Sequence, residues 1–257
     1  MDKAKASALL GSALLALLAL VPTGQAEVSQ RNGVRVAVNG SLSPTRLPRR
    51  GSVPVSVSVS GEISPLNEAA LPQLQKLTVA INSAGHLDLH GVPHCRIGHI
   101  NPSTNQEALD ACRSSLIGEG RFSADVKLPE QSPFPSEGRL LAFNGTIGGK
   151  PAIFGHIYGT KPLPTSFVLP FRVKQRRGTY GTILEASFPR ATGEWGYVTG
   201  ISLDLNKKRF LNAGCPAPKG FPKAVFPLMK TSFSFAGGLK LDNTLIRSCK
   251  ARDGQGR

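Results

Sequence analysis

The chain has 257 residues, of which 31 are Lys or Arg and 16 are Asp or Glu, so its formal net charge at pH 7 is +15. This length is sufficient to bury a full core and suits one large all-β domain or two small ones. The 28 Gly and 20 Pro residues argue against a mostly helical protein and favour a β architecture that is rich in turns.

The first 26 residues predict a secretory signal peptide. Lys3 and Lys5 precede an apolar run from Ala8 to Val21, and small residues follow at Gly24 and Ala26, the two positions that a signal peptidase reads. The run of 14 residues is too short for a membrane-spanning helix, which needs about 20. We therefore expect cleavage after Ala26 and a protein that is secreted, or associated with the cell envelope, without a transmembrane segment in its mature form.

Alternating residues predict strands along most of residues 27–250. The clearest run has valine at 53, 55, 57 and 59 and Pro54, Ser56, Ser58 and Ser60 between them, which directs valines to a core and hydroxyls to water. Pro54 indicates an edge position, because proline lacks the N–H that a ladder needs. Other strands are expected near residues 34–39, 77–81, 122–128, 140–143, 153–158, 167–173, 182–188, 197–205, 233–235 and 239–241, the last two joined by a tight turn at Gly237-Gly238. About ten or more short antiparallel strands predict an all-β, β-sandwich-like domain.

One short helix is expected at residues 104–111, because Thr104 and Glu107 form a capping box. Four cysteines in an exported chain permit two disulfides, with three possible connectivities. We favour Cys95–Cys112 and Cys215–Cys249, since each pair brackets a local unit. A zinc site is disfavoured because neither pair has the close spacing that zinc ligands usually show.

Domain boundaries are suggested at two places. The prolines from Pro162 to Pro164 suggest a division into two sub-domains near residues 160–165. Residues 251–257 are small, polar or charged, which predicts a disordered tail. The oligomeric state is not indicated, and a monomer is assumed.

The charge suggests a polyanionic partner. Removing residues 1–26 removes two Lys and one Asp, which leaves 29 basic and 15 acidic residues and a net charge of +14. Such a field attracts anionic cell-envelope polymers, although it also serves solubility. The basic groups at residues 49–50, 174–177 and 207–209 are scattered over apparent loops without interleaved aromatic residues, so no specific nucleic-acid site is predicted.

The histidines are the candidate metal ligands. If residues 86–90 form a strand, His86, Asp88 and His90 project from one face and could hold a transition metal. The alternative is an exposed polar strand face followed by a loop. His156 lies in an otherwise apolar strand and is interpreted as a core residue.

Catalytic signatures are sparse. The sequence contains no Gly-x-Ser-x-Gly elbow, no His-Glu-x-x-His pair and no phosphate-cradling glycine loop, so no catalytic residue and no cofactor is assigned. Trp195 and Tyr197 are candidates for a ligand-binding surface, and the alternative is a turn whose aromatic residues cap the sandwich.

Several short runs resemble those of exported proteins of soil actinobacteria, a family without an established activity. These runs are residues 93–96, 108–112, 179–182, 196–199 and 214–221. The resemblance covers nearly the whole mature chain. It implies export, paired cysteines and a location in a bacterial envelope or medium, and it implies no functional site.

The sequence therefore favours a secreted, non-catalytic binding or structural protein that interacts with anionic polymers through its basic surface. Two alternatives remain open. One is a carrier of an apolar ligand between the β-sheets, suggested by phenylalanines at positions 167, 171, 233 and 235. The other is a secreted hydrolase that uses carboxylates or a His-bound metal.

Overall fold

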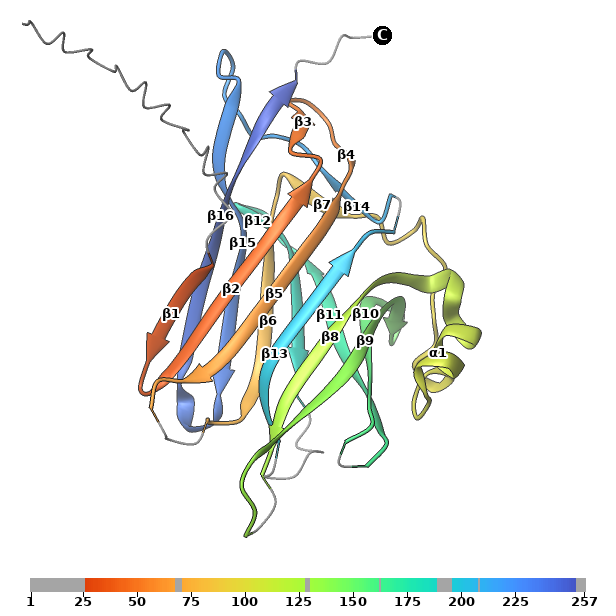
Figure 1. Ribbon diagram of the computed structural model, residues 1–257. Coiled ribbons are helices and arrows are strands. Elements are labelled where there is room, and N and C mark those ends of the chain that lie inside the picture. Colours follow the sequence, from red (N-terminus) through yellow and green to blue (C-terminus); the bar gives the residue numbers. More distant parts are fainter. Residues whose placement is uncertain are drawn as a thin grey trace, which may run out of the picture.

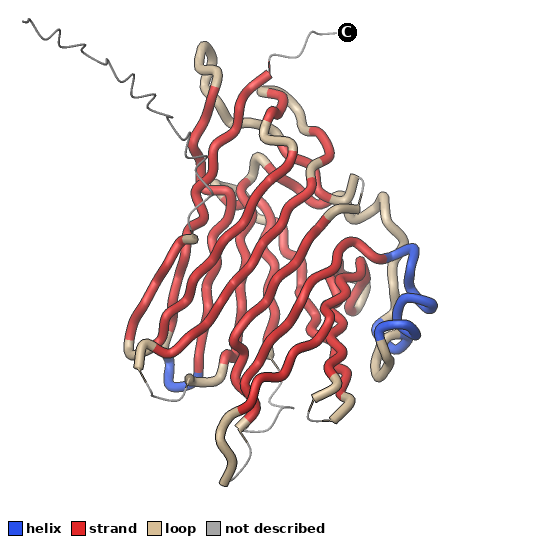
Figure 2. Tube along the Cα trace, in the orientation of Figure 1, coloured by secondary structure: helices blue, strands red, loops and turns tan. Residues whose placement is uncertain are grey.

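The computed structural model describes residues 26–67, 71–127, 130–161, 163–188, 196–207 and 209–252. The expected signal peptide, apart from Ala26, lies outside these residues, as do Trp195 and residues 253–257 of the expected tail. Strands dominate the described chain, and its one α-helix lies outside the sheet at one side (Figures 1 and 2).

The elements follow one another in this order: β1 (Glu27–Arg31), β2 (Val34–Ser43), β3 (Arg46–Pro48), β4 (Val53–Pro54), β5 (Ser56–Pro65), β6 (Leu74–Asn82), β7 (Gly85–Leu87), η1 (Ile97–His99), α1 (Asn105–Cys112), η2 (Arg113–Ser115), β8 (Leu116–Val126), β9 (Phe134–Ile147), β10 (Lys150–Gly159), β11 (Thr165–Gln175), β12 (Tyr180–Ser187), β13 (Gly196–Leu205), β14 (Leu211–Ala213), β15 (Lys223–Phe235), η4 (Ala236–Gly238) and β16 (Lys240–Arg252).

Within the described residues, thirteen strands form one large sheet in the order β1-β2-β5-β13-β8-β9-β10-β11-β12-β6-β15-β16-β3. Neighbouring strands are antiparallel except for β16 and β3, which are parallel. The sheet curls, so that its two halves face each other across the core (Figure 1). The predicted all-β, sandwich-like fold is confirmed, with one continuous curled sheet supplying both layers.

The valine pattern faces the interior as predicted. Val55 is buried, and Val57 and Val59 point inward from β5, whereas Ser56 and Ser58 are exposed. Pro54 lies in β4, an edge strand of the second, three-stranded sheet β4-β14-β7. The local alternation therefore determines which side chains enter the core.

The small sheet packs against one end of the core. The N–H of Val55 donates to the carbonyl of Leu211 at 2.9 Å, and that of Asp88 donates to the carbonyl of Phe210 at 2.7 Å. Phe210 is fully buried, and Leu211 and Ala213 of β14 belong to the same hydrophobic cluster as Ile153 of the large sheet. These contacts join both sheets into one core.

The predicted helix and both disulfides are confirmed. Thr104 caps α1 by accepting a hydrogen bond from the N–H of Glu107, whose carboxylate accepts one from the N–H of Thr104. The disulfides join Cys95 to Cys112 and Cys215 to Cys249. The first holds α1 against the outer face of β9 and β10, where Phe143 and Phe154 are fully buried.

Side chains close the seam between β16 and β2, which do not pair through their backbones. Asn243 is buried, and its Nδ2 donates to the carbonyls of Glu27 at 2.8 Å and Val36 at 3.4 Å. Arg247 Nε donates to the carbonyl of Gly40 at 2.7 Å. The first and last long strands of the sheet are therefore held together by polar side chains.

The structure shows how residues 160–164 and 251–252, at the two suggested boundaries, are arranged. Gly159 pairs with Thr165, so residues 160–164 connect adjacent strands of the same sheet. Ala251 and Arg252, which composition assigned to the tail, instead continue β16 and pair with Leu47 and Pro48. The disulfide at Cys249 and the ladder with β3 order these residues, although their composition is that of a tail.

Candidate ligand-binding cavity

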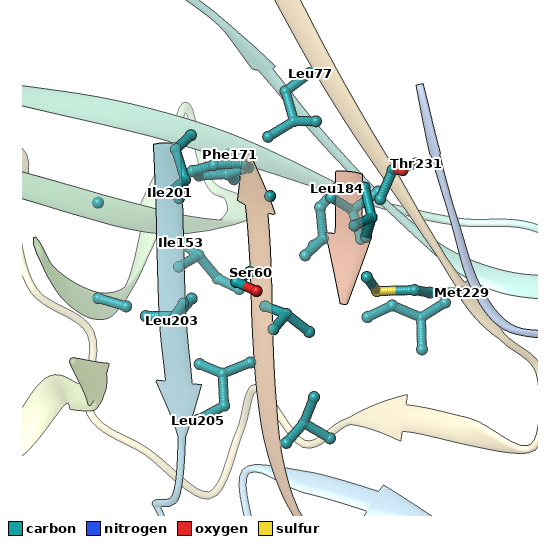
Figure 3. Close-up of a pocket in the computed structure, with 18 of the residues that line it drawn as sticks. Ser60, Leu77, Ile153, Phe171, Leu184, Ile201, Leu203, Leu205, Met229 and Thr231 are labelled. Atoms are coloured by element: carbon teal, nitrogen blue, oxygen red, sulfur yellow. The ribbon is translucent and has the colours of Figure 1, made fainter. Parts of the chain in front are cut away.

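The curled sheet encloses an apolar cavity of about 170 Å³ (Figure 3). Side chains from strands all around the sheet line it, and β14 and β7 contribute at the end covered by the small sheet. Leu184 and Met229 lie on one side, across from Ile201 and Leu203 of β13 (Figure 3). The cavity is therefore a property of the whole sheet and belongs to no single segment.

Small residues create part of the space. Gly61, Ala142 and Gly155 lie among the lining residues at positions that point inward. A Cβ atom at Gly61 would meet no atom closer than the ring of Phe233 at 3.6 Å, so a side chain could occupy this space. Inward-facing Val57 and Leu203 line the cavity and are only partly buried, and both also pack against the buried cluster that contains Ile153 and Leu211.

The lining has almost no polar character. Among its described residues, hydroxyl groups occur only at Ser60 and Thr231, and no side chain is charged. The Oγ1 atom of Thr231 is buried and has no hydrogen-bond partner among the residues that the structure describes. Apolar cavities of about 150 Å³ stay dry and bind molecules such as benzene. The cavity therefore suits a small apolar molecule or the apolar end of a larger one.

Two of the four phenylalanines that suggested an apolar carrier reach the cavity. Phe171 and Phe233 line it. Phe167 packs edge-on against Phe122, with ring centroids 5.5 Å apart, and Phe235 is buried in the neighbouring core. Most of the other lining residues are valines, leucines and isoleucines, and nothing in the sequence distinguishes them from tightly packed core residues.

The three candidate metal ligands lie at the end of β7. The strand ends at Leu87, and Asp88 Oδ1 accepts hydrogen bonds from the backbone N–H groups of His90 at 3.2 Å and Gly91 at 3.1 Å. This turn removes the alternation that a strand through His90 would have had. Across the described ranges, no three His, Cys, Asp or Glu side chains form a group that could hold a metal ion.

Of the two aromatic candidates, only Tyr197 is described. It lies in β13 opposite Asp125 and is partly buried against the core cluster that contains Val34 and Phe233. Trp195 lies outside the described residues.

His156 is fully buried on the outer face of β10, where it holds the chain that precedes α1. Its Nε2 lies 3.0 Å from the carbonyl oxygen and 3.1 Å from the Oγ of Ser103, while Nδ1 has no hydrogen-bond partner in the described part of the chain. Burial lowers the pKa of His156, and the hydrogen bond to the Ser103 backbone partly opposes this shift. A neutral imidazole that donates through Nε2 satisfies this geometry, in agreement with its interpretation as a core residue.

We expect His156 to make stability dependent on pH. An unfolded histidine has a pKa of about 6.5. Because the folded-state pKa is lower, the unfolded chain binds more protons in the interval between the two values, and stability falls as the pH drops below about 6.5. In urea unfolding from pH 7.5 to 5, His156→Gln should show a weaker pH dependence than the wild type. His90→Gln, at an exposed histidine, should retain the wild-type dependence. Equal slopes in all three proteins would contradict this assignment.

Comparisons with known proteins add no relative: no protein-family model, no curated protein and no solved structure matches the chain. No helix within the described residues is long and apolar enough to cross a membrane. The cavity geometry therefore carries the functional argument.

Proposed function

We propose that this protein is a secreted, non-catalytic binding protein that carries a small apolar ligand inside its curled sheet. The observation that supports the proposal is the cavity of about 170 Å³, whose lining is apolar except for two hydroxyl groups. Filled cores pack at the density of organic crystals, so a void of this size costs stability unless a ligand occupies it. A ligand would recover the dispersion contacts that the lining side chains lack.

The dimensions of the cavity limit the ligand class. Ligand pockets for drug-sized molecules usually measure about 300–1,000 Å³. The smaller volume here favours one aromatic ring system or a short aliphatic chain. With no charge in the lining, an anionic or cationic group would have to remain outside, because its desolvation would not be compensated.

Binding of toluene and naphthalene by the mature protein tests the proposal. Ligands that bind only the folded state raise the unfolding temperature as their concentration rises. We expect a concentration-dependent increase with both probes. No increase with any apolar probe up to its solubility limit would overturn the carrier proposal.

A matched pair of variants locates the binding site. Val59→Phe adds an aromatic ring inside the cavity, whereas Val28→Phe makes the same change at an exposed valine of β1. We expect Val59→Phe to weaken toluene binding at least about tenfold, or about 1.4 kcal/mol. Because the new ring enters empty space, Val59→Phe should avoid the usual loss of about 1–3 kcal/mol on overpacking. Unchanged toluene binding by Val59→Phe would place the ligand elsewhere.

A further inference from the structure

Three cations lie side by side across the upper end of three adjacent strands. Lys223 of β15 pairs with Lys250 of β16, which in turn pairs with Arg46 of β3. All three side chains are exposed. Like charges directly opposite each other destabilise a sheet, so this row is unfavourable without a neighbouring anion.

More cations lie in the adjoining segments. Arg49 donates from its guanidinium to the carbonyls of Ala217 at 2.8 Å and Phe221 at 3.0 Å, and its N–H donates to the carbonyl of Arg252 at 3.1 Å. These bonds hold the chain after β3 against the loop before β15. We call the resulting surface the basic end; it comprises Arg46, Arg49, Arg50, Lys219, Lys223, Lys250 and Arg252.

Acidic residues are missing from the segments that build the basic end. Residues 44–52, 216–226 and 246–252 contain no Asp or Glu. β3, the carboxyl end of β16 and the start of β15 meet at the same end of the molecule (Figure 1). The three segments are far apart in sequence, so their charges combine only in the folded protein.

Apolar side chains protrude from the same end. Phe221 is 62% exposed and precedes Lys223 by two residues, and Val225 is 74% exposed and follows Lys223 by two. In strand geometry, Val225 shares the outward face with Lys223. Exposed aromatic and aliphatic groups among cations match the boundary between lipid headgroups and acyl chains.

We propose that the basic end docks the protein on a bilayer that contains anionic lipids. The cations face the lipid phosphates, and Phe221 and Val225 insert between the headgroups. An anionic polymer in water would satisfy the charges and leave these two apolar side chains exposed. Docking does not require the cavity.

Vesicle co-flotation tests the charge requirement. We expect the mature protein to bind vesicles that contain about 30% phosphatidylglycerol but not pure phosphatidylcholine, and to dissociate at high salt. Each lysine near an anionic surface contributes about 1 kcal/mol, so Lys223→Gln with Lys250→Gln should weaken binding about 25-fold. The matched control is Lys127→Gln with Lys161→Gln, at exposed lysines after the distal ends of β8 and β10. An equal loss in both pairs would show a response to net charge alone and would overturn a localised docking face.

The apolar contacts separate a membrane from a soluble polyanion. Phe221→Ala with Val225→Ala should weaken vesicle binding about tenfold or more, given about 25 cal/mol per Å² of apolar surface buried. Binding to soluble polyphosphate should not change. Leu163→Ala, at a residue that is 70% exposed in the loop after β10, is the control for general surface apolarity. Unchanged vesicle affinity in the Phe221/Val225 variant would identify the basic end as a polyanion site and contradict membrane docking. Val59→Phe fills the cavity, so retained vesicle binding by this variant would show that docking does not depend on ligand binding in the cavity.

Discussion

Replacing Cys215 and Cys249 with alanine is expected to lower the free energy of unfolding by about 4 kcal/mol. The disulfide joins residues with a sequence separation of 34, and closing a loop of this length lowers the entropy of the unfolded chain. Both cysteines are almost fully buried. The bond ties the residues that follow β14 to the last strand, so its loss should also loosen the loop that carries Phe221. Urea unfolding of the oxidised wild type and the double variant measures the difference.

The matched control for this prediction is the second disulfide. Cys95→Ala with Cys112→Ala opens a loop with a separation of only 17 residues, for which the same model predicts about 3 kcal/mol. This bond holds α1 on the outer face of the sheet and lies away from the basic end. We therefore expect vesicle binding to weaken in the Cys215/Cys249 variant and to persist in the Cys95/Cys112 variant. The reverse order of stability or of vesicle binding would contradict this division of roles.

Gly120→Ala is expected to cost at least about 3 kcal/mol, at the upper end of the range for overpacked positions. Gly120 lies in β8, and a Cβ there would collide with the carbonyl oxygen of Ser202 in β13. Because the obstacle is backbone, no side-chain rotation relieves it, and the two strands must separate.

Gly98→Ala provides the control for Gly120→Ala. A Cβ at Gly98 would meet no atom within 4 Å, and the residue lies in the exposed turn η1. The free energy of unfolding of the Gly98→Ala variant should stay within about 0.5 kcal/mol of the wild-type value. A small effect at Gly120 would show that β8 and β13 can move apart without disturbing the sheet.

Sequence analysis did not identify the basic end, and it did not show how the chain turns after His86. From the sequence, the basic residues at 49–50, 174–177 and 207–209 are scattered over apparent loops, because composition cannot show which loops meet. Folding brings Arg46, Lys223 and Lys250 into one row, although more than 170 residues separate the first two. The metal-site hypothesis depended on a strand through His90, but the strand ends at Leu87, because the Asp88 carboxylate accepts hydrogen bonds from the N–H groups of His90 and Gly91 and turns the chain.

Sequence alone determined what depends on neighbours along the chain. Alternation directed Val57 inward and Ser58 outward, and the Thr104 capping box started α1, since both patterns act within a few residues.

Only the tertiary structure determined that the core contains a cavity. Periodicity places Val57, Leu184 and Met229 on inward faces, but only strand order and curl determine whether such side chains meet in contact or across empty space. The same long-range pairing gathered the basic end, because its cations come from strands that are neighbours only in the folded sheet.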